Sequence, residues 1–242
     1  MNLIGIGANN PETIRMIKMV KLKDPTFEFL GFIDNDEAKK GKNYFGFPVF
    51  GGSDTIPQLL GNEVFFVNLI TRDCVTRYET SLQASAFGAQ FGNFIHPSVN
   101  LEMVDLAVGN YIQESVVLQA GVRLGYNSSI HIGTLVGHES IVGNSVFIAH
   151  GCNISGLVRV KDGVFIGAGA TVLPRITIGE WTVIAPGSVV RKDVPSYSLV
   201  AGNPAKVLKR RPVPYVSGAP FGQTHPMVTT MQTDMTSKDG LS

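Results

Sequence analysis

Cysteine, charge and long apolar runs are all scarce in this chain, and each scarcity narrows its class. Cys74 and Cys152 are the only two cysteines in 242 residues, which favours a reducing cytoplasm over a disulfide-dependent secreted fold. Charged residues make up only 16% and the formal net charge is +1, so no surface for nucleic acid is indicated. There is no run of about 18 apolar residues, which argues against a membrane span. The first ten residues lack the basic flank and long apolar core of a signal peptide. We therefore expect a soluble, cytoplasmic protein.

What the chain does have is an aliphatic residue at every sixth position from Leu106 to Val190, without interruption. A helix repeats near 3.6 residues and a strand near 2, so neither alone produces this period. A period of six is typical of hexapeptide-repeat β-helices, in which three short strands close a triangular coil of about 18 residues. The aliphatic side chains would then point into the coil. The fifteen positions are Leu106, Ile112, Leu118, Leu124, Ile130, Val136, Val142, Ile148, Ile154, Val160, Ile166, Val172, Ile178, Ile184 and Val190.

Two secondary patterns accompany this repeat. The fourth residue after most of the aliphatics is small or β-branched, as expected for a second inward position near a tight corner. Cys152 falls on this pattern, so we expect a buried thiol there. Glycine directly follows the aliphatic at five positions, consistent with turns in which a Cβ is costly. These are Gly125, Gly137, Gly143, Gly167 and Gly179.

The chain divides by pattern into three segments. Residues 1–92 alternate apolar strands, near 3–7, 27–33 and 63–70, with helices, and predict a small Rossmann-like α/β domain. Its helices are expected to begin at Asn10–Pro11, at a cap formed by Ser53–Asp54, and near residue 72, the last reaching residue 87. Residues 93–211 predict the β-helix domain. Residues 212–242 are rich in Pro, Ser, Thr and Gly, and we expect a flexible tail.

Four local motifs resemble one known family. They are the Gly31–Asp36 stretch with Gly46–Val49 and Gly51–Gly52, Phe94–Pro97, Gly137–Gly143, and Ala201–Lys206. Together they are similar to the NeuD/PglD-like sugar O-/N-acetyltransferases of bacterial surface-glycan pathways, over about residues 1–211. The last motif is shared by many hexapeptide acyltransferases, so it supports the activity class more than the subfamily.

The resemblance implies a left-handed parallel β-helix behind an N-terminal domain that holds a sugar or nucleotide-sugar. It also implies acetyl-CoA as acyl donor, no metal, and a homotrimer with active sites between adjacent β-helices. The reaction expected is transfer of an acyl group to an amino or hydroxyl group of the sugar.

His138 and Glu139 are the candidate catalytic pair. His138 stands second after the inward-facing Val136, so its side chain should lie on the outside of a coil. A neutral imidazole can take a proton from an amine or hydroxyl that attacks a thioester. Glu139 could hold the other ring nitrogen and stabilise the imidazolium. In the matched family the histidine at this position is the base; a solvated surface pair is the other interpretation.

The acyl-donor side rests on several positions. The family usually has a CoA-contacting histidine nine residues after the base; Phe147 stands there, and His150 is the candidate to replace it. Gly156 lies 18 residues after His138, one coil on, where a backbone N–H could stabilise an oxyanion. Small residues on later coils, which would leave room for the pantetheine arm, are Gly167, Ala168 and Ala185. Candidates for the CoA phosphates, or equally for an ordinary charged end-cap, are Lys192, Lys206, Lys209 and Arg210.

The acceptor side departs more from the family. Gly7, Ala8 and Asn9 replace its glycine-rich Gly-His-Gly loop, although a helix N-terminus can still bind a phosphate. Asp34 and Asn35, at the end of the second strand, match the family's pair that contacts ribose or base. His131 falls where the family often has Asn near the substrate, and is otherwise a surface residue. A free sugar, another nucleotide or a small amine stays open as acceptor.

Two other functions use the same scaffold. A γ-carbonic anhydrase-like hydratase needs three histidines that converge on zinc. His131, His138 and His150 are three in number but lack that family's closely spaced pair. A non-catalytic β-helix used for assembly is the other alternative, against which the His138–Glu139 pair and the Ala201–Lys206 ending argue.

Overall fold

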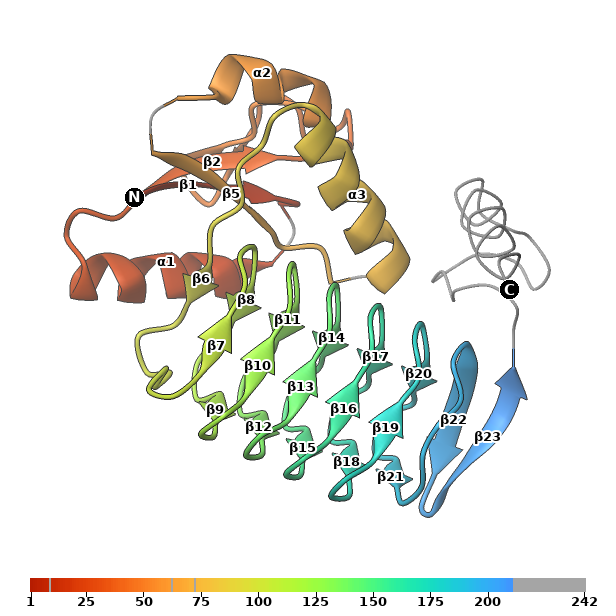
Figure 1. Ribbon diagram of the computed structural model, residues 1–242. Helices are drawn as coiled ribbons and strands as arrows, with labels where there is room; N and C mark the ends of the chain where they lie inside the picture. The colour runs from red at the N-terminus through yellow and green to blue at the C-terminus, as the bar shows by residue number, and fades with distance from the viewer. Residues whose placement is uncertain (9, 62, 72, 211–242) are drawn as a thin grey trace, which may run out of the picture.

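The computed structural model describes residues 1–8, 10–61, 63–71 and 73–210. A small α/β region is followed by a long three-sided β-solenoid (Figure 1). The predicted fold class, a left-handed β-helix behind an N-terminal α/β region, is confirmed. Asn9 and the predicted tail 212–242 lie outside the described residues.

The α/β region is built on a three-stranded parallel sheet in the order β2–β1–β5. The strands are β1 (Asn2–Ile6), β2 (Glu28–Ile33) and β5 (Val64–Asn68), each within two residues of its predicted bounds. Leu3, Ile4 and Ile6 are all buried, as expected when both faces of a parallel sheet are covered. A short antiparallel hairpin of β3 (Asn43–Tyr44) and β4 (Phe47–Pro48) follows β2.

The helices of this region begin largely where the sequence indicated. α1 (Pro11–Lys23) starts at the predicted proline, and Asn10 Oδ1 accepts a hydrogen bond from Glu12 N at 2.9 Å. α3 (Cys74–Ala86) is capped by Asp73, whose Oδ1 accepts from Thr76 N at 2.7 Å.

The predicted cap at Ser53–Asp54 is wrong. Residues Ser53–Thr55 form a 3-10 turn, η1, and the helix α2 (Ile56–Leu59) begins after it without a side-chain cap. The reason is a longer-range bond: Ser53 N and Oγ both donate to Asn35 Oδ1, at 2.8 and 3.2 Å.

The solenoid has three faces of strands, most of them two residues long and parallel to their neighbours except for β23; each face is named here after one of its strands. The β7 face consists of β7 (Asp105–Leu106), β10 (Arg123–Leu124), β13 (Ile141–Val142), β16 (Arg159–Val160) and β19 (Thr177–Ile178). The β9 face consists of β9 (Val117–Leu118), β12 (Leu135–Val136), β15 (Asn153–Ile154), β18 (Thr171–Val172) and β21 (Val189–Val190). The β8 face consists of β6 (Phe94–Ile95), β8 (Tyr111–Ile112), β11 (Ser129–Ile130), β14 (Phe147–Ile148), β17 (Phe165–Ile166), β20 (Val183–Ile184), β22 (Ser198–Gly202) and β23 (Ala205–Arg210).

The predicted inward residues form one continuous core. Fourteen of the fifteen aliphatics are buried, and Leu106 on the first coil is partly buried against them. The second inward positions are buried as well, including Cys152 at 1% exposed. Where the residue at such a position is Ser or Thr, its hydroxyl forms hydrogen bonds to the next coil. For example, Ser140 Oγ donates to Ser155 O at 3.0 Å and accepts from Val158 N at 3.1 Å. Burial of these polar groups is therefore compensated by hydrogen bonds.

The corners explain the glycine pattern. A Cβ on Gly137 would stand 2.5 Å from the backbone of the next coil at Gly156, and Gly125, Gly143, Gly167 and Gly179 are similarly tight. The cause is close approach of stacked coils, because none of these five glycines has a positive φ. The left-handed residue of each turn comes two positions later, and at one corner it is Glu139, with φ 55°.

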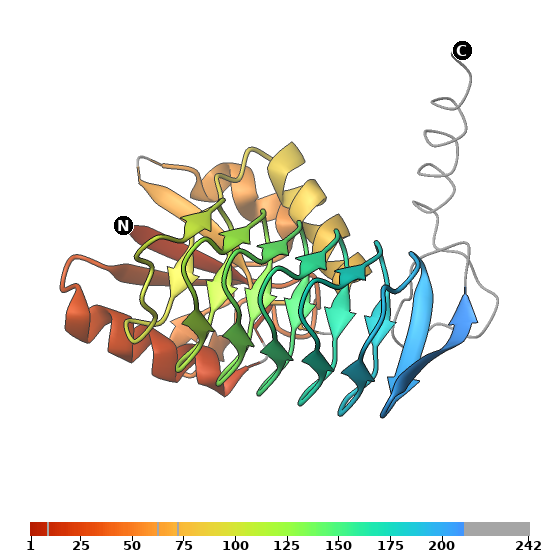
Figure 2. The same ribbon diagram turned by 60° about the horizontal axis from the view of Figure 1, so that its bottom comes forward.

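The α/β region packs along the β8 face, from the first coils to the corner that contains Trp181 (Figures 1 and 2). Phe94 stacks on Tyr111 with ring centroids 5.7 Å apart, and both belong to the core cluster of the α/β region. On α3, Cys74 joins the solenoid core and Tyr78 meets Trp181 edge-on at 5.6 Å. The two parts thus share apolar cores; the exact domain boundary at residues 92–93 stays a prediction.

The solenoid ends in the antiparallel pair β22–β23, which contains the cis peptide Asn203–Pro204. No helix in the part of the chain that the structure describes is both long enough and apolar enough to cross a membrane.

Candidate active site at a corner of the solenoid

His138 and Glu139 form the outer tip of the turn between β12 and β13. This turn belongs to a corner, called here the His138 corner, where the β9 face meets the β7 face. The two side chains are 58% and 65% exposed, so the expected outward orientation of His138 is correct. The corner continues in the turns 119–122 below and 155–158 above.

The two ring nitrogens of His138 have different surroundings. Nδ1 lies 3.6 Å from Glu139 Oε2. Nε2 lies on the other side of the ring and faces Gly156 of the next coil. A Cβ added to Gly156 would stand only 2.5 Å from Nε2. Glu139 can therefore favour the tautomer that carries its proton on Nδ1, which leaves the lone pair of Nε2 as the proton acceptor.

The backbone of this turn is fixed from both neighbouring coils. His138 N donates to the side-chain Oε1 of Gln119 at 2.9 Å, and Glu139 N donates to Ala120 O at 3.0 Å. From the next coil, Leu157 N donates to His138 O at 2.8 Å. The position of the imidazole is thus set by residues about 18 positions away on either side.

Gly156 combines space with an available donor. Its carbonyl accepts from Arg175 N at 3.1 Å, whereas its N–H makes none of the hydrogen bonds found among the described residues. The equivalent N–H one coil earlier, that of His138, is bonded to the Gln119 side chain. Gly137 occupies the place of Gln119 beneath Gly156 and has no side chain to do the same. The Gly156 N–H is therefore left without a partner among the described residues.

His131, Phe147 and His150 gather at a different corner, where the β8 face meets the β9 face, called here the His150 corner. The ring of His131 lies 4.5 Å from that of Phe147 and 5.4 Å from that of the exposed His150, between centroids. His138 and His150 thus lie at different corners of the solenoid within one chain.

His131 is not a surface residue, contrary to one of the two interpretations of the sequence. It is 2% exposed, and its Nε2 lies 2.9 Å from Ser129 Oγ. Burial, aided by the nearby His150 and Arg77, lowers the pKa of His131 to about 3, so the ring is neutral. The sequence could not show this, because the α/β region covers the β8 face only in the folded chain.

The small residues expected along the CoA path do not all lie on the His138 corner. Gly167, Ala168 and Ala185 continue the His150 corner, whereas Gly156 continues the His138 corner. A groove lined by both sets therefore needs the His150 corner of an adjoining protomer. Lys206, on β23, and Lys192 line an open cavity of about 560 Å³ at the end of the solenoid.

Among the residues predicted to bind the acetyl acceptor, Asp34 forms hydrogen bonds within the chain. Its Oδ2 accepts from Ala8 N at 2.9 Å and from Lys39 Nζ at 2.7 Å, which fixes the loop that follows Gly7. Burial disfavours the ionised carboxylate, but the bonds from Lys39, Ala8 and Asp36 outweigh it and hold the pKa of Asp34 below its ordinary value. Asn35 is similarly engaged, by Ser53.

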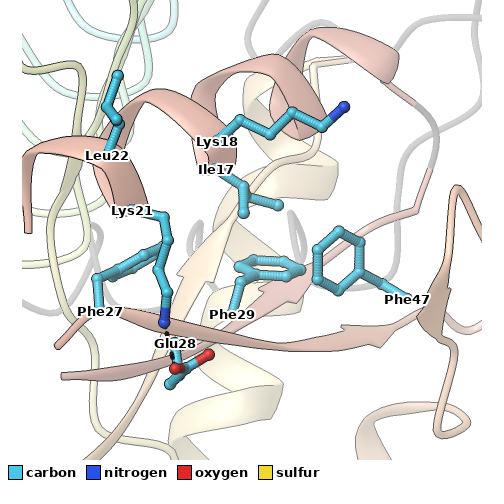
Figure 3. A pocket seen from close by; sticks show the side chains of 8 residues that line it. All are labelled: Ile17, Lys18, Lys21, Leu22, Phe27, Glu28, Phe29 and Phe47. Carbon is cyan, nitrogen blue, oxygen red and sulfur yellow. Dashed lines mark hydrogen bonds and ion pairs between the residues drawn. The ribbon is translucent and has the colours of Figure 1, made fainter. Parts of the chain in front are cut away.

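One further hollow was not anticipated. It lies between α1 and the start of β2, with a volume of about 550 Å³, and Figure 3 shows Ile17, Phe29 and Phe47 lining it. Lys21 and Glu28 form an ion pair across its rim. The cluster of phenylalanines between residues 27 and 47 is the sequence feature that could have predicted this apolar hollow. No group of three or more metal-ligating side chains occurs among the described residues.

The comparisons with known proteins agree with this architecture. The family model described as bacterial transferase hexapeptide (six repeats) matches residues 158–192. Perosamine N-acetyltransferase from Caulobacter crescentus, solved as a mutant with CoA and GDP-perosamine, is 25% identical with a TM-score of 0.75, covering 86% of this chain and 97% of that one. The acetyltransferase domain of PglB from Neisseria gonorrhoeae, solved with acetyl coenzyme A, is 25% identical with a TM-score of 0.75, covering 86% and 98%.

Part of the chain is also similar to a curated relative of another kind. Serine acetyltransferase 2 of Arabidopsis thaliana is 34% identical over 120 residues, which are 45% of this chain and 37% of that protein. The chain thus spans little more than a third of the length of this relative. The resemblance to sugar acetyltransferases with hexapeptide repeats is confirmed by the solved structures, which cover both parts of the chain.

Proposed function

We propose that the protein transfers an acetyl group from acetyl-CoA to an amino or hydroxyl group of a sugar or nucleotide-sugar, in surface-glycan biosynthesis. One observation carries the proposal: an exposed imidazole has a carboxylate 3.6 Å from its Nδ1 and has its Nε2 beside Gly156, whose backbone N–H has no partner among the described residues. His138 and Glu139 can together remove a proton from the acceptor, and the Gly156 N–H can stabilise the oxyanion that develops on the thioester carbonyl.

In this mechanism His138 Nε2 takes a proton from the acceptor as its nitrogen or oxygen attacks the thioester carbonyl. The carbonyl oxygen becomes an oxyanion, and the Gly156 N–H donates to it. Glu139 stabilises the imidazolium that forms. Collapse of the tetrahedral intermediate breaks the C–S bond, and the proton held by His138 can then pass to the departing CoA thiolate.

The donor is expected to lie between protomers of a homotrimer. Gly156 from one protomer and Gly167, Ala168, Ala185 and His150 from the His150 corner of the next would line its groove, with Lys206 near the phosphates. Phe147, predicted as a further contact, is only 6% exposed and would support this groove from within the core. The acceptor would be held by Gly7, Ala8, Asp34 and Asn35. His131, which is buried beside His150, would support the His150 corner. The two buried free thiols, Cys74 and Cys152, favour a cytoplasmic location.

Serine is the second acceptor that a specific observation favours, because serine acetyltransferases are curated relatives of the solenoid. The α/β region favours the sugar, because the sugar acetyltransferase structures match 86% of the chain and the serine enzyme only 45%.

The test is a transfer assay with acetyl-CoA and a panel of acceptors: amino- and hydroxy-sugars, free and nucleotide-linked, and serine. CoA release and the acetylated product are both measured. His138→Ala should lower turnover by at least about a hundredfold, the low end for loss of a general base. His96→Ala is the matched control, because His96 lies at the start of the solenoid and bonds Ser98. Near-normal turnover of His138→Ala would refute the assignment.

A further inference from the structure

Gln119 makes a contact that the proposed chemistry does not use. It begins the turn of the His138 corner one coil before His138, and its own N–H donates to Val136 O at 3.0 Å in the ladder between coils. Its side chain then reaches to the next coil, where Oε1 accepts from His138 N at 2.9 Å. Gln119 is exposed in the single chain, so packing does not by itself explain its orientation.

The same turn supports Glu139. A Cβ on Gly121 would stand 3.1 Å from Glu139 Cγ, so the turn that contains Gln119 and Gly121 forms a floor beneath both members of the pair. The ring of His138 points away from this floor, toward Gly156 of the next coil. The backbone is therefore held from one side while the imidazole faces the other.

We propose that Gln119 is a positioning residue for His138, which fixes the turn so that Nε2 stays beside Gly156. The proposal rests on the proposed acetyl transfer. Its physical basis is that a base must stay within hydrogen-bond reach of the proton it removes, and a displacement of about 1 Å can cost about a hundredfold in rate. A left-handed residue such as Glu139 at the tip of a turn persists only where its surroundings hold it, and the Gln119 bond to His138 N is one such restraint.

The chain supplies a matched control. Asn144 Oδ1 accepts from Tyr126 N at 2.8 Å, the same kind of bond between coils, at the third corner of the solenoid. Asn144→Leu removes a turn-fixing side chain away from the His138 corner, and Gln119→Leu removes one beneath His138. Because Asn144 Nδ2 also donates to Asp162 Oδ2 at 3.1 Å, Asn144→Leu should lower the melting temperature at least as much as Gln119→Leu, so a larger loss of turnover in Gln119→Leu reports on position.

The experiment compares wild type, Gln119→Leu, Gln119→Glu and Asn144→Leu. Amide hydrogen exchange at His138, read by mass spectrometry without substrate, should speed up at least about tenfold in Gln119→Leu. With the acceptor found in the transfer screen, kcat should fall about ten- to a hundredfold, while KM for acetyl-CoA changes by less than about twofold.

Gln119→Glu keeps an oxygen acceptor and should restore both exchange protection and most of kcat. Unchanged exchange at His138, or a kcat for Gln119→Leu within about twofold of Asn144→Leu, would overturn the positioning role. Protected exchange in a wild type that transfers no acetyl group would instead overturn the proposed function.

Discussion

The imidazole of His138 packs against Gly156, which is one coil further along the solenoid. Nε2 lies only 2.5 Å from the point where a Cβ on Gly156 would stand. Substitution by any residue with a side chain must therefore move the ring. Gly156→Ala should lower kcat by at least about tenfold, because misplacement of the base by about 1 Å is enough. Steady-state kinetics check this against Gly61→Ala, where the added Cβ would meet its nearest neighbour at an ordinary 3.5 Å. Equal kinetics for the two variants would contradict the geometry.

Glu139 should influence the base through charge. Its Oε2 lies 3.6 Å from His138 Nδ1, so its carboxylate favours the imidazolium. In Glu139→Gln the carboxylate that stabilises the imidazolium formed during the reaction is lost, so kcat should fall by about tenfold or more. Steady-state kinetics of Glu139→Gln and wild type at one pH measure this. Equal kcat values for the two would show that Glu139 does not assist the base.

His131 should make folding stability depend on pH. Its pKa is about 3 in the folded chain against an ordinary 6.5, because burial disfavours the charged ring. Between these values the unfolded chain binds a proton that the folded chain does not, so stability falls as the pH drops from about 6.5 toward 3. The slope is up to about 1.4 kcal/mol per pH unit for one proton.

Denaturant unfolding at fixed protein concentration, from pH 7 to pH 4, tests this dependence. His131→Asn removes the titrating group, so its stability should fall less steeply with decreasing pH, whatever its absolute stability. Parallel curves for His131→Asn and wild type would mean that His131 titrates alike in both states.

Arg77 joins the α/β region to the solenoid. The residue is fully buried, and its Nε donates to Asn127 O at 2.8 Å while Nη1 donates to Ile70 O at 3.1 Å. Burial lowers the pKa of its guanidinium to about 10. Arg77→Met leaves two carbonyls without these donors, each at about 1–3 kcal/mol, and relief of the buried charge offsets part of the loss.

We therefore expect a net destabilisation of about 1–3 kcal/mol for Arg77→Met, measured by denaturant unfolding. Arg159→Met, on the exposed outer side of β16, is the control and should be close to neutral. A stability of Arg77→Met equal to that of the control would show that the relief of charge balances the lost bonds.

Much of the candidate site could be predicted because the repeat is regular. His138 follows Val136 by two positions, which places it outside the coil, and Gly156 follows His138 by one full coil of 18 residues. The prediction for Ser53 failed, because Asn35, 18 residues earlier, accepts the bonds that a helix cap would have used. Local pattern contains no information about such partners.

The sequence by itself determined the solenoid, because a coil repeats one local requirement, an inward aliphatic at every sixth residue, and fifteen repetitions leave no other register. Only the tertiary structure decided what each histidine meets. Stacking of coils set Gln119 beneath His138 and left Gly156 above it with an unbonded N–H, and packing of the α/β region against the β8 face buried His131 in a neutral state. These surroundings depend on residues that are distant in the chain and adjacent only after the coils and the sheet have packed.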